Sequence, residues 1–186
     1  MKTFDELWKE LEERSKRWCI PIVQDYKELE HVFNLIKGCQ SYLEIGTAEG
    51  NGLYVLASAL QPMAAIAIID LGEKHTKAAR DEVIEKLELK EPRFLQTLGN
   101  SHSPEIINKA ANWLYDVVFI DAGHTYEDVI ADAIAYGHLA TKYIIFHDIK
   151  LPPVKAAVEW YLKQNPQPKY YEFINSETYG YGIITL

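Results

Sequence analysis

Four short apolar runs in this chain each end in an acidic residue. The runs are YLEIG, IAIID, VVFID and IIFHD, and their acids are Glu44, Asp70, Asp121 and Asp148. If the runs are parallel strands, their carboxyl ends meet at one edge of the sheet, where open α/β sheets bind ligands. A single acid at such a place is more often a cap for the following helix. Four acids in four runs favour a shared site at this edge.

The first of these acids opens a glycine-rich segment, EIGTAEGNG. Gly46 and Gly50 would let a ligand approach bare backbone. The segment is neither a P-loop nor a dinucleotide motif, because Ala48 and Asn51 stand where Gly-x-Gly-x-x-Gly needs glycine. Glu49 would repel a pyrophosphate. A positively charged ligand without phosphate is favoured, and S-adenosylmethionine, with a sulfonium and an ammonium against one carboxylate, is such a ligand.

The second acid suits the same cofactor. Asp70 follows the glycines by about twenty residues and ends the second apolar run, where a carboxylate can accept hydrogen bonds from ribose hydroxyls. A nicotinamide-dependent oxidoreductase is a further alternative, disfavoured by the glycine spacing and by Glu49.

These residues need a scaffold of alternating strands and helices. Helical spacing of apolar residues predicts helices over residues 3–17 and 25–37, ahead of the first apolar run. Strands and helices then alternate, which predicts an α/β fold with a doubly wound, mostly parallel sheet. The tail KYYEFINSETYGYGIITL reads as two strands joined by a turn around residues 175–180, so the last strand should be antiparallel. We expect one domain, residues 1–186, in which helices within residues 1–38 precede the core.

Composition excludes several classes of protein. The 186 residues are 48% hydrophobic with a formal net charge of −8, which argues against a nucleic-acid partner. The two cysteines, Cys19 and Cys39, suggest neither a disulfide framework nor a zinc site. No apolar run is long enough for a membrane span, and the N-terminus does not resemble a secretory signal. A cytoplasmic protein with a small-molecule substrate is expected; a homodimer is one of the assemblies that the sequence leaves open.

From about residue 40 to its end, the chain resembles class I S-adenosylmethionine-dependent methyltransferases. The motifs that carry the resemblance are LEIGTAEGNG, AIIDLG, LGNSHSPEII, VVFIDAGHTYEDVIAD and IIFHDI. The last two are most similar to a small group with Asp-x-x-His-x-Tyr and His-Asp motifs, related to macrocin-type O-methyltransferases and cephalosporin-hydroxylase-like proteins. The resemblance implies a Rossmann-like, seven-stranded fold with an antiparallel last strand. It also implies O-methylation of a small molecule or sugar, with a non-catalytic S-adenosylmethionine-binding module as the alternative.

The resemblance also assigns cofactor-binding residues. Glu44, Gly46 and Gly50 would line the methionine end, and Asp70 would hold the ribose. Asn100 and Ser101 match the family position beside the adenine, and Asp121 matches the acid close to the transferring methyl group.

For metal binding and catalysis, the resemblance leaves alternative assignments open. In metal-using relatives, the acids matching Asp121 and Asp148 bind magnesium; here Ile149 lacks a donor, so His147 or His124 would be the third ligand of Mg²⁺ or Mn²⁺. The alternative has no metal: Asp148 caps the next helix and His147 holds Asp121 in place. His124, helped by Asp121, is the candidate catalytic base, unless it only caps a helix or bonds a carboxylate.

Overall fold

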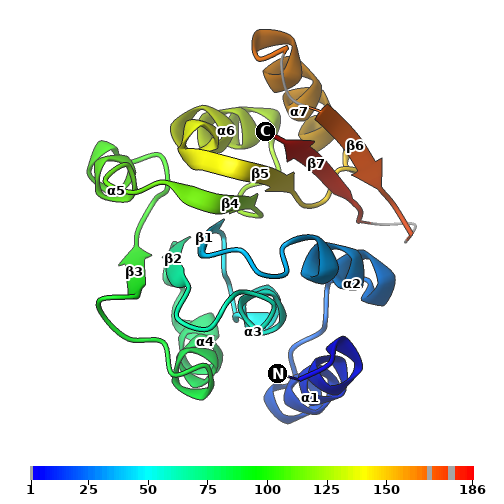
Figure 1. Ribbon diagram of the computed structural model, residues 1–186, viewed down its shortest axis with the longest axis vertical. Helices are drawn as coiled ribbons and strands as arrows, with labels where there is room; N and C mark the ends of the chain where they lie inside the picture. The colour runs from blue at the N-terminus through cyan, green and yellow to red at the C-terminus, as the bar shows by residue number, and fades with distance from the viewer. Residues whose placement is uncertain (1, 167–168, 176–178) are drawn as a thin grey trace.

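Seven strands form one sheet in the computed structural model, which describes residues 2–166, 169–175 and 179–186. The strand order is β3-β2-β1-β4-β5-β7-β6, as Figure 1 shows. The strands are β1 (Ser41–Ile45), β2 (Ala65–Asp70), β3 (Phe94–Leu98), β4 (Tyr115–Ile120), β5 (Ala140–Phe146), β6 (Lys169–Phe173) and β7 (Tyr181–Thr185). β1 to β5 pair in parallel, whereas β7 runs antiparallel to both β5 and β6. The predicted Rossmann-like sheet of seven strands, mostly parallel with an antiparallel last strand, is confirmed.

Helices cover both faces of the sheet (Figure 1). They are α1 (Phe4–Trp18), α2 (Tyr26–Leu35), α3 (Asn51–Ala57), α4 (Lys74–Lys86), α5 (Pro104–Ala110), α6 (Tyr126–Tyr136) and α7 (Pro152–Gln164), with a 3₁₀ turn at Gly137–Leu139. Alternate strand residues face opposite sides: Tyr42 packs with α1 to α4, whereas Leu43 and Ile45 pack with α5 to α7. The sheet is therefore doubly wound, as the alternation of strands and helices predicted.

The antiparallel last strand sits inside the sheet. β7 lies between β5 and β6, and its Ile183 and Ile184 are fully buried. Its connection to β6 is held from α2, where the buried carboxylate of Glu28 accepts the backbone N–H groups of Asn175, at 2.6 Å, and Gly180, at 2.9 Å. Within the predicted turn, residues 176–178 lie outside the described part of the chain. The predicted direction of the last strand is confirmed.

None of the four strand-end acids caps a helix. The N-cap residues of α3, α4, α6 and α7 are Gly50, Glu73, Thr125 and Leu151. The expectation that Asp148 caps α7 is wrong, because Leu151 precedes that helix and no side chain bonds its first turn. The acids are therefore left to interact at the sheet edge. No helix within the described residues combines the length and apolarity needed to cross a bilayer.

Candidate active site at the carboxyl edge of the sheet

Two cavities lie at the carboxyl edge of the parallel strands and share a wall. The larger one, about 490 Å³, extends over the ends of β2 and β3, and the smaller one, about 350 Å³, extends toward the loop after β5. Gly46, Ala48, Asp121 and Ala122 line both of them. One elongated molecule could therefore occupy both cavities by passing over the ends of β1 and β4.

Gly46 makes this junction. Its φ of +89° is in the left-handed region, and an added Cβ would lie 2.2 Å from the carbonyl oxygen of Asp121. Its backbone N–H donates to the carbonyl of Ile69, at 2.8 Å. A side chain is thus excluded by the neighbouring strand end, and the backbone of Gly46 is exposed toward both cavities.

The other residues predicted for the methionine end differ in position. Gly50 lines neither cavity; it turns the chain into α3 with a φ of +82°, and its added Cβ would contact Val83. Glu44 lines the smaller cavity and is 2% exposed. Burial, together with the charge of Asp121, raises the pKa of Glu44 well above its usual value, and the hydroxyl of Tyr42 donates to its carboxylate at 3.1 Å.

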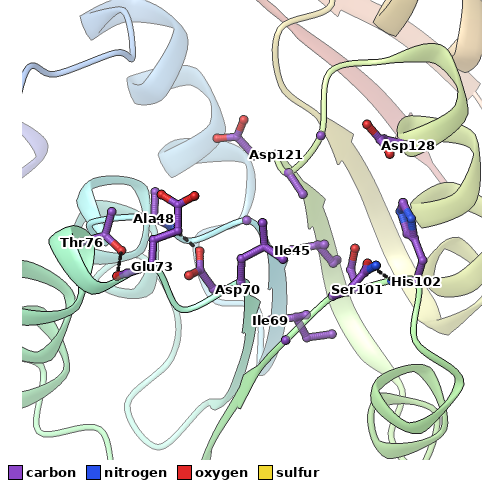
Figure 2. A pocket seen from close by; sticks show the side chains of 16 residues that line it. Ile45, Ala48, Ile69, Asp70, Glu73, Thr76, Ser101, His102, Asp121 and Asp128 are labelled. Atoms are coloured by element: carbon purple, nitrogen blue, oxygen red, sulfur yellow. Dashed lines mark hydrogen bonds between the residues drawn. The ribbon is translucent and has the colours of Figure 1, made fainter.

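Asp70 lines the larger cavity and is held by three donors. It accepts the backbone N–H groups of Ala48 and Gly72, at 2.8 and 2.7 Å, and Nη1 of Arg80, at 2.8 Å. Figure 2 shows Asp70 turned toward Ala48, with Ser101 and His102 on the far side of the cavity. A carboxylate offers about four lone-pair sites, so one acceptor site stays available for a ligand.

Arg80 was not found by the sequence reasoning. It lies on α4, is fully buried, and donates from Nη1 to both the carbonyl of Ala48 and the carboxylate of Asp70. In the sequence it belongs to a charged amphipathic stretch, KHTKAARDEVIEK, with several other basic residues. The sequence gives no reason to expect Arg80 to be buried and the others to be exposed. Only the packing of α4 against the glycine-rich segment distinguishes it.

The far end of the larger cavity is formed after β3. Asn100 and Ser101, the two residues predicted to lie beside the adenine, line this end together with His102. The Asn100 side chain accepts the backbone N–H of His102, at 2.9 Å, which fixes the turn. The His102 ring lies 3.3 Å from the carboxylate of Asp132, whose burial raises its pKa. Asp132 was also missed, because on α6 it looks like any polar helix residue.

The histidines and acids predicted for metal binding and catalysis come together at the smaller cavity. His147 Nδ1 lies 3.0 Å from Asp121 Oδ1, and His124 Nε2 lies 2.8 Å from Asp148 Oδ2 and 3.8 Å from Asp121 Oδ1. Ligand atoms of Asp121, His124 and Asp148 all lie within 4.8 Å of one another. His147 is buried with only 3% exposure and is not part of that group.

The ionisation of this cluster follows from its contacts. Hydrogen bonds to Asp121 and Asp148 raise the pKa of His124 to about 10. Burial opposes ionisation of Asp121, but His147 and His124 nevertheless hold its pKa below the usual value. In this arrangement His124 is therefore an imidazolium at neutral pH, which neutralises part of the carboxylate charge.

The two joined cavities form one acid-lined trough at the edge of a Rossmann-like sheet. Residues 43–149 match the family described as Methyltransferase domain, and the chain belongs to that family. The O-methyltransferase from Bacillus cereus, solved with S-adenosylhomocysteine, is 18% identical with a TM-score of 0.76; the match covers 100% of this chain and 92% of that one. TomG from Streptomyces achromogenes, solved with S-adenosylmethionine and involved in tomaymycin synthesis, is 14% identical with a TM-score of 0.74, covering 97% and 89%. No curated protein matches the chain in sequence.

Proposed function

We propose that this protein is an S-adenosylmethionine-dependent O-methyltransferase that methylates a hydroxyl group of a small molecule. One observation carries the proposal: the two cavities meet at Gly46 and Asp121, the residues that directly follow β1 and β4. A cofactor with two distinct halves suits two joined cavities, and its reactive centre would lie at the junction.

The larger cavity suits the adenosine half. We assign the ribose hydroxyls to the acceptor site that Asp70 keeps after its three protein contacts. Asn100 and Ser101 would line the adenine. The methionine half would pass over Gly46 toward Glu44, which leaves Gly50 the indirect role of shaping the loop.

Catalysis would take place in the smaller cavity, by in-line displacement at the methyl carbon. Asp121, at the junction, would orient the acceptor hydroxyl, and orientation alone can contribute several powers of ten to the rate. His124 is the proposed base, but as an imidazolium bonded to Asp148 it cannot accept a proton. The base role therefore requires the acceptor hydroxyl to displace His124 from Asp148, which lowers the pKa of the ring.

As an alternative to the base role of His124, the same residues fit a divalent ion with His124 as a ligand. Asp121, Asp148 and His124 offer two carboxylates and one imidazole at suitable mutual distances, whereas Ile149 is fully buried in the core. His124 thus fits the third position better than His147, whose Nδ1 lies against Asp121. A set with imidazole favours Mn²⁺ or another transition ion over Mg²⁺. When bound, such an ion would lower the pKa of the acceptor hydroxyl.

Two measurements test the proposal in sequence. Titration calorimetry should show micromolar binding of S-adenosylhomocysteine, about −8 kcal/mol, and no binding of NADH. A radiolabelled methyl-transfer assay over a panel of hydroxylated compounds then separates an enzyme from a binding module. S-adenosylhomocysteine binding without methylation of any acceptor would favour the module, and NADH binding alone would refute the cofactor assignment.

A further inference from the structure

The charge of the smaller cavity restricts the acceptor, if the proposed methyl transfer is correct. Its lining includes the carboxyl groups of Glu44, Glu49, Asp121 and Asp148. Among the described residues that line it, no lysine or arginine is present, and the basic groups are two histidines. Both histidines are engaged with Asp121 or Asp148, at 3.0 and 2.8 Å. An incoming anion would therefore find no free cation to pair with.

Hydrogen-bonding groups in the same cavity lack protein partners. The hydroxyl of Thr47, Nε2 of His147 and Oε1 of Gln24 are buried atoms without a hydrogen-bond partner among the described residues. All three residues line the smaller cavity, and Thr47 and His147 are only 4% and 3% exposed. Buried polar groups are normally satisfied, so these groups indicate a ligand with several hydrogen-bonding groups of its own.

A divalent ion would not reverse this charge. Such an ion balances Asp121 and Asp148, which leaves Glu49 at the cavity wall. Glu49 is half-buried, and its backbone carbonyl is held from α1 by Nη2 of Arg14, at 2.6 Å, so the segment that carries it is fixed. Its carboxyl group therefore stays at the cavity wall beside the acceptor, whether or not an ion is bound.

We propose that the acceptor is a polyhydroxylated compound bearing an ammonium group, and that this cavity ranks acceptors as cationic, then neutral, then anionic. Compounds whose only charge is a carboxylate or phosphate are poor acceptors. The preference arises from Glu49 and from the lack of a free cation among the described residues that line the cavity, and the unpartnered groups of Thr47, His147 and Gln24 bind the hydroxyls.

The test uses matched compounds and protein saturated with S-adenosylhomocysteine. One series is dopamine, 4-ethylcatechol and 3,4-dihydroxyphenylacetate; the second is glucosamine, glucose and glucuronate. Saturation-transfer NMR and calorimetry at low ionic strength should show the amine binding roughly tenfold more tightly than the carboxylate in at least one series. Carboxylates that bind as tightly as their amines in every series that binds, or no binding in either series, would overturn the proposal.

Charge-changing variants locate the preference. Glu49→Lys should reduce the ratio of amine to carboxylate affinity by about tenfold, and Glu49→Gln by less. Glu85→Lys, the same change on the exposed surface of α4, should leave the ratio unaltered. The affinity for S-adenosylhomocysteine is measured first in each protein, so that the cofactor hypothesis and the acceptor hypothesis can fail separately. If the wild type does not bind S-adenosylhomocysteine, the cofactor assignment is wrong. If it binds but Glu49→Lys leaves the ratio of amine to carboxylate affinity unchanged, only the acceptor assignment is wrong.

Discussion

The two joined cavities differ in how completely their polar groups are satisfied by the protein. In the larger one, Asp70 already has three donors and Asn100 fixes its own turn. Nε2 of His102, which has no hydrogen-bond partner among the described residues, still lies 3.3 Å from the Asp132 carboxylate. In the smaller one, the hydroxyl of Thr47 and Nε2 of His147 are buried without partners among the described residues. The protein itself holds Asp70 and Asn100 in the larger cavity, which suits the constant adenosine part of the proposed cofactor. The smaller cavity keeps hydrogen-bonding capacity for the methionine tail and an acceptor.

Changing Asp121 should give the largest effect, because it stands where the cavities meet. Asp121→Asn keeps the size of the side chain but removes the charge that faces His147 and His124. We expect methyl transfer to fall by on the order of 10²–10⁴, with S-adenosylhomocysteine affinity changed less than about fivefold. Asp81→Asn on α4 is the surface control. If turnover and S-adenosylhomocysteine affinity both fall by a similar factor, Asp121 is needed for cofactor binding and not specifically for methyl transfer.

Gly46 tests whether the junction depends on close backbone approach. Gly46→Ala would place a Cβ 2.2 Å from the Asp121 carbonyl, so the strand ends must separate. We expect a loss of about 3 kcal/mol in the free energy of unfolding, or failure to fold. Gly38→Ala is a matched control: its φ is +84°, but nothing lies within 4 Å of the added Cβ. That variant should cost only about 1 kcal/mol of backbone strain in urea unfolding. Equal losses would show that strain, not the contact, requires Gly46.

Replacing Asp70 should weaken cofactor binding in the larger cavity without changing acceptor binding in the smaller one. Asp70→Ala removes the proposed ribose acceptor and leaves buried Arg80 without its carboxylate. S-adenosylhomocysteine affinity should weaken by about 1–3 kcal/mol in calorimetry, with the relative affinities of different acceptors unchanged. Arg80→Gln, which disturbs Asp70 without removing it, should have a smaller effect in the same direction. Unchanged cofactor affinity in Asp70→Ala would remove this residue from the site.

Asn100 should give the smallest effect. Asn100→Ala deletes the acceptor for the N–H of His102 and loosens the turn beside the adenine position. A loss of about 0.5–1.5 kcal/mol in S-adenosylhomocysteine affinity is expected, with turnover at saturating cofactor unchanged. Asn108→Ala, exposed on α5, is the control. A large fall in turnover would mean that this end of the trough also shapes the reaction.

Most of the fold could be predicted because it depends on local patterns. Apolar runs between amphipathic helices gave the parallel strands, and the apolar end GIITL after a turn-rich segment gave the antiparallel β7. The gathering of acids at one edge also followed, since parallel strands end on the same side. Asp121 and Asp148 do approach the same imidazole, that of His124.

Two contacts that tune the site were among the alternatives predicted from the sequence, that of His147 with Asp121 and that of His124 with a carboxylate. The contact of Arg80 with Asp70 could not be predicted, because it depends on how α4 packs against the glycine-rich segment. Nothing in the pattern around Arg80 distinguishes a buried partner of Asp70 from a surface residue. Gly46 looked like a ligand-facing glycine, yet its strongest constraint is the carbonyl of Asp121. His124 was expected either as a base or as the partner of a carboxylate; it lies 2.8 Å from Asp148, and its hydrogen bonds to Asp121 and Asp148 raise its pKa to about 10. Ionisation and close contact depend on three-dimensional packing that helical or strand periodicity does not encode.

The assignment of the larger cavity to adenosine, and of the smaller cavity to the methionine tail and the acceptor, is tested most directly by a crystal structure with S-adenosylhomocysteine bound. We predict the adenine beside Asn100 and Ser101, a ribose hydroxyl on Asp70, the sulfur between Gly46 and Asp121, and open space for the acceptor beside His124 and Asp148. An adenine placed in the smaller cavity, or a ribose without contact to Asp70, would contradict the account.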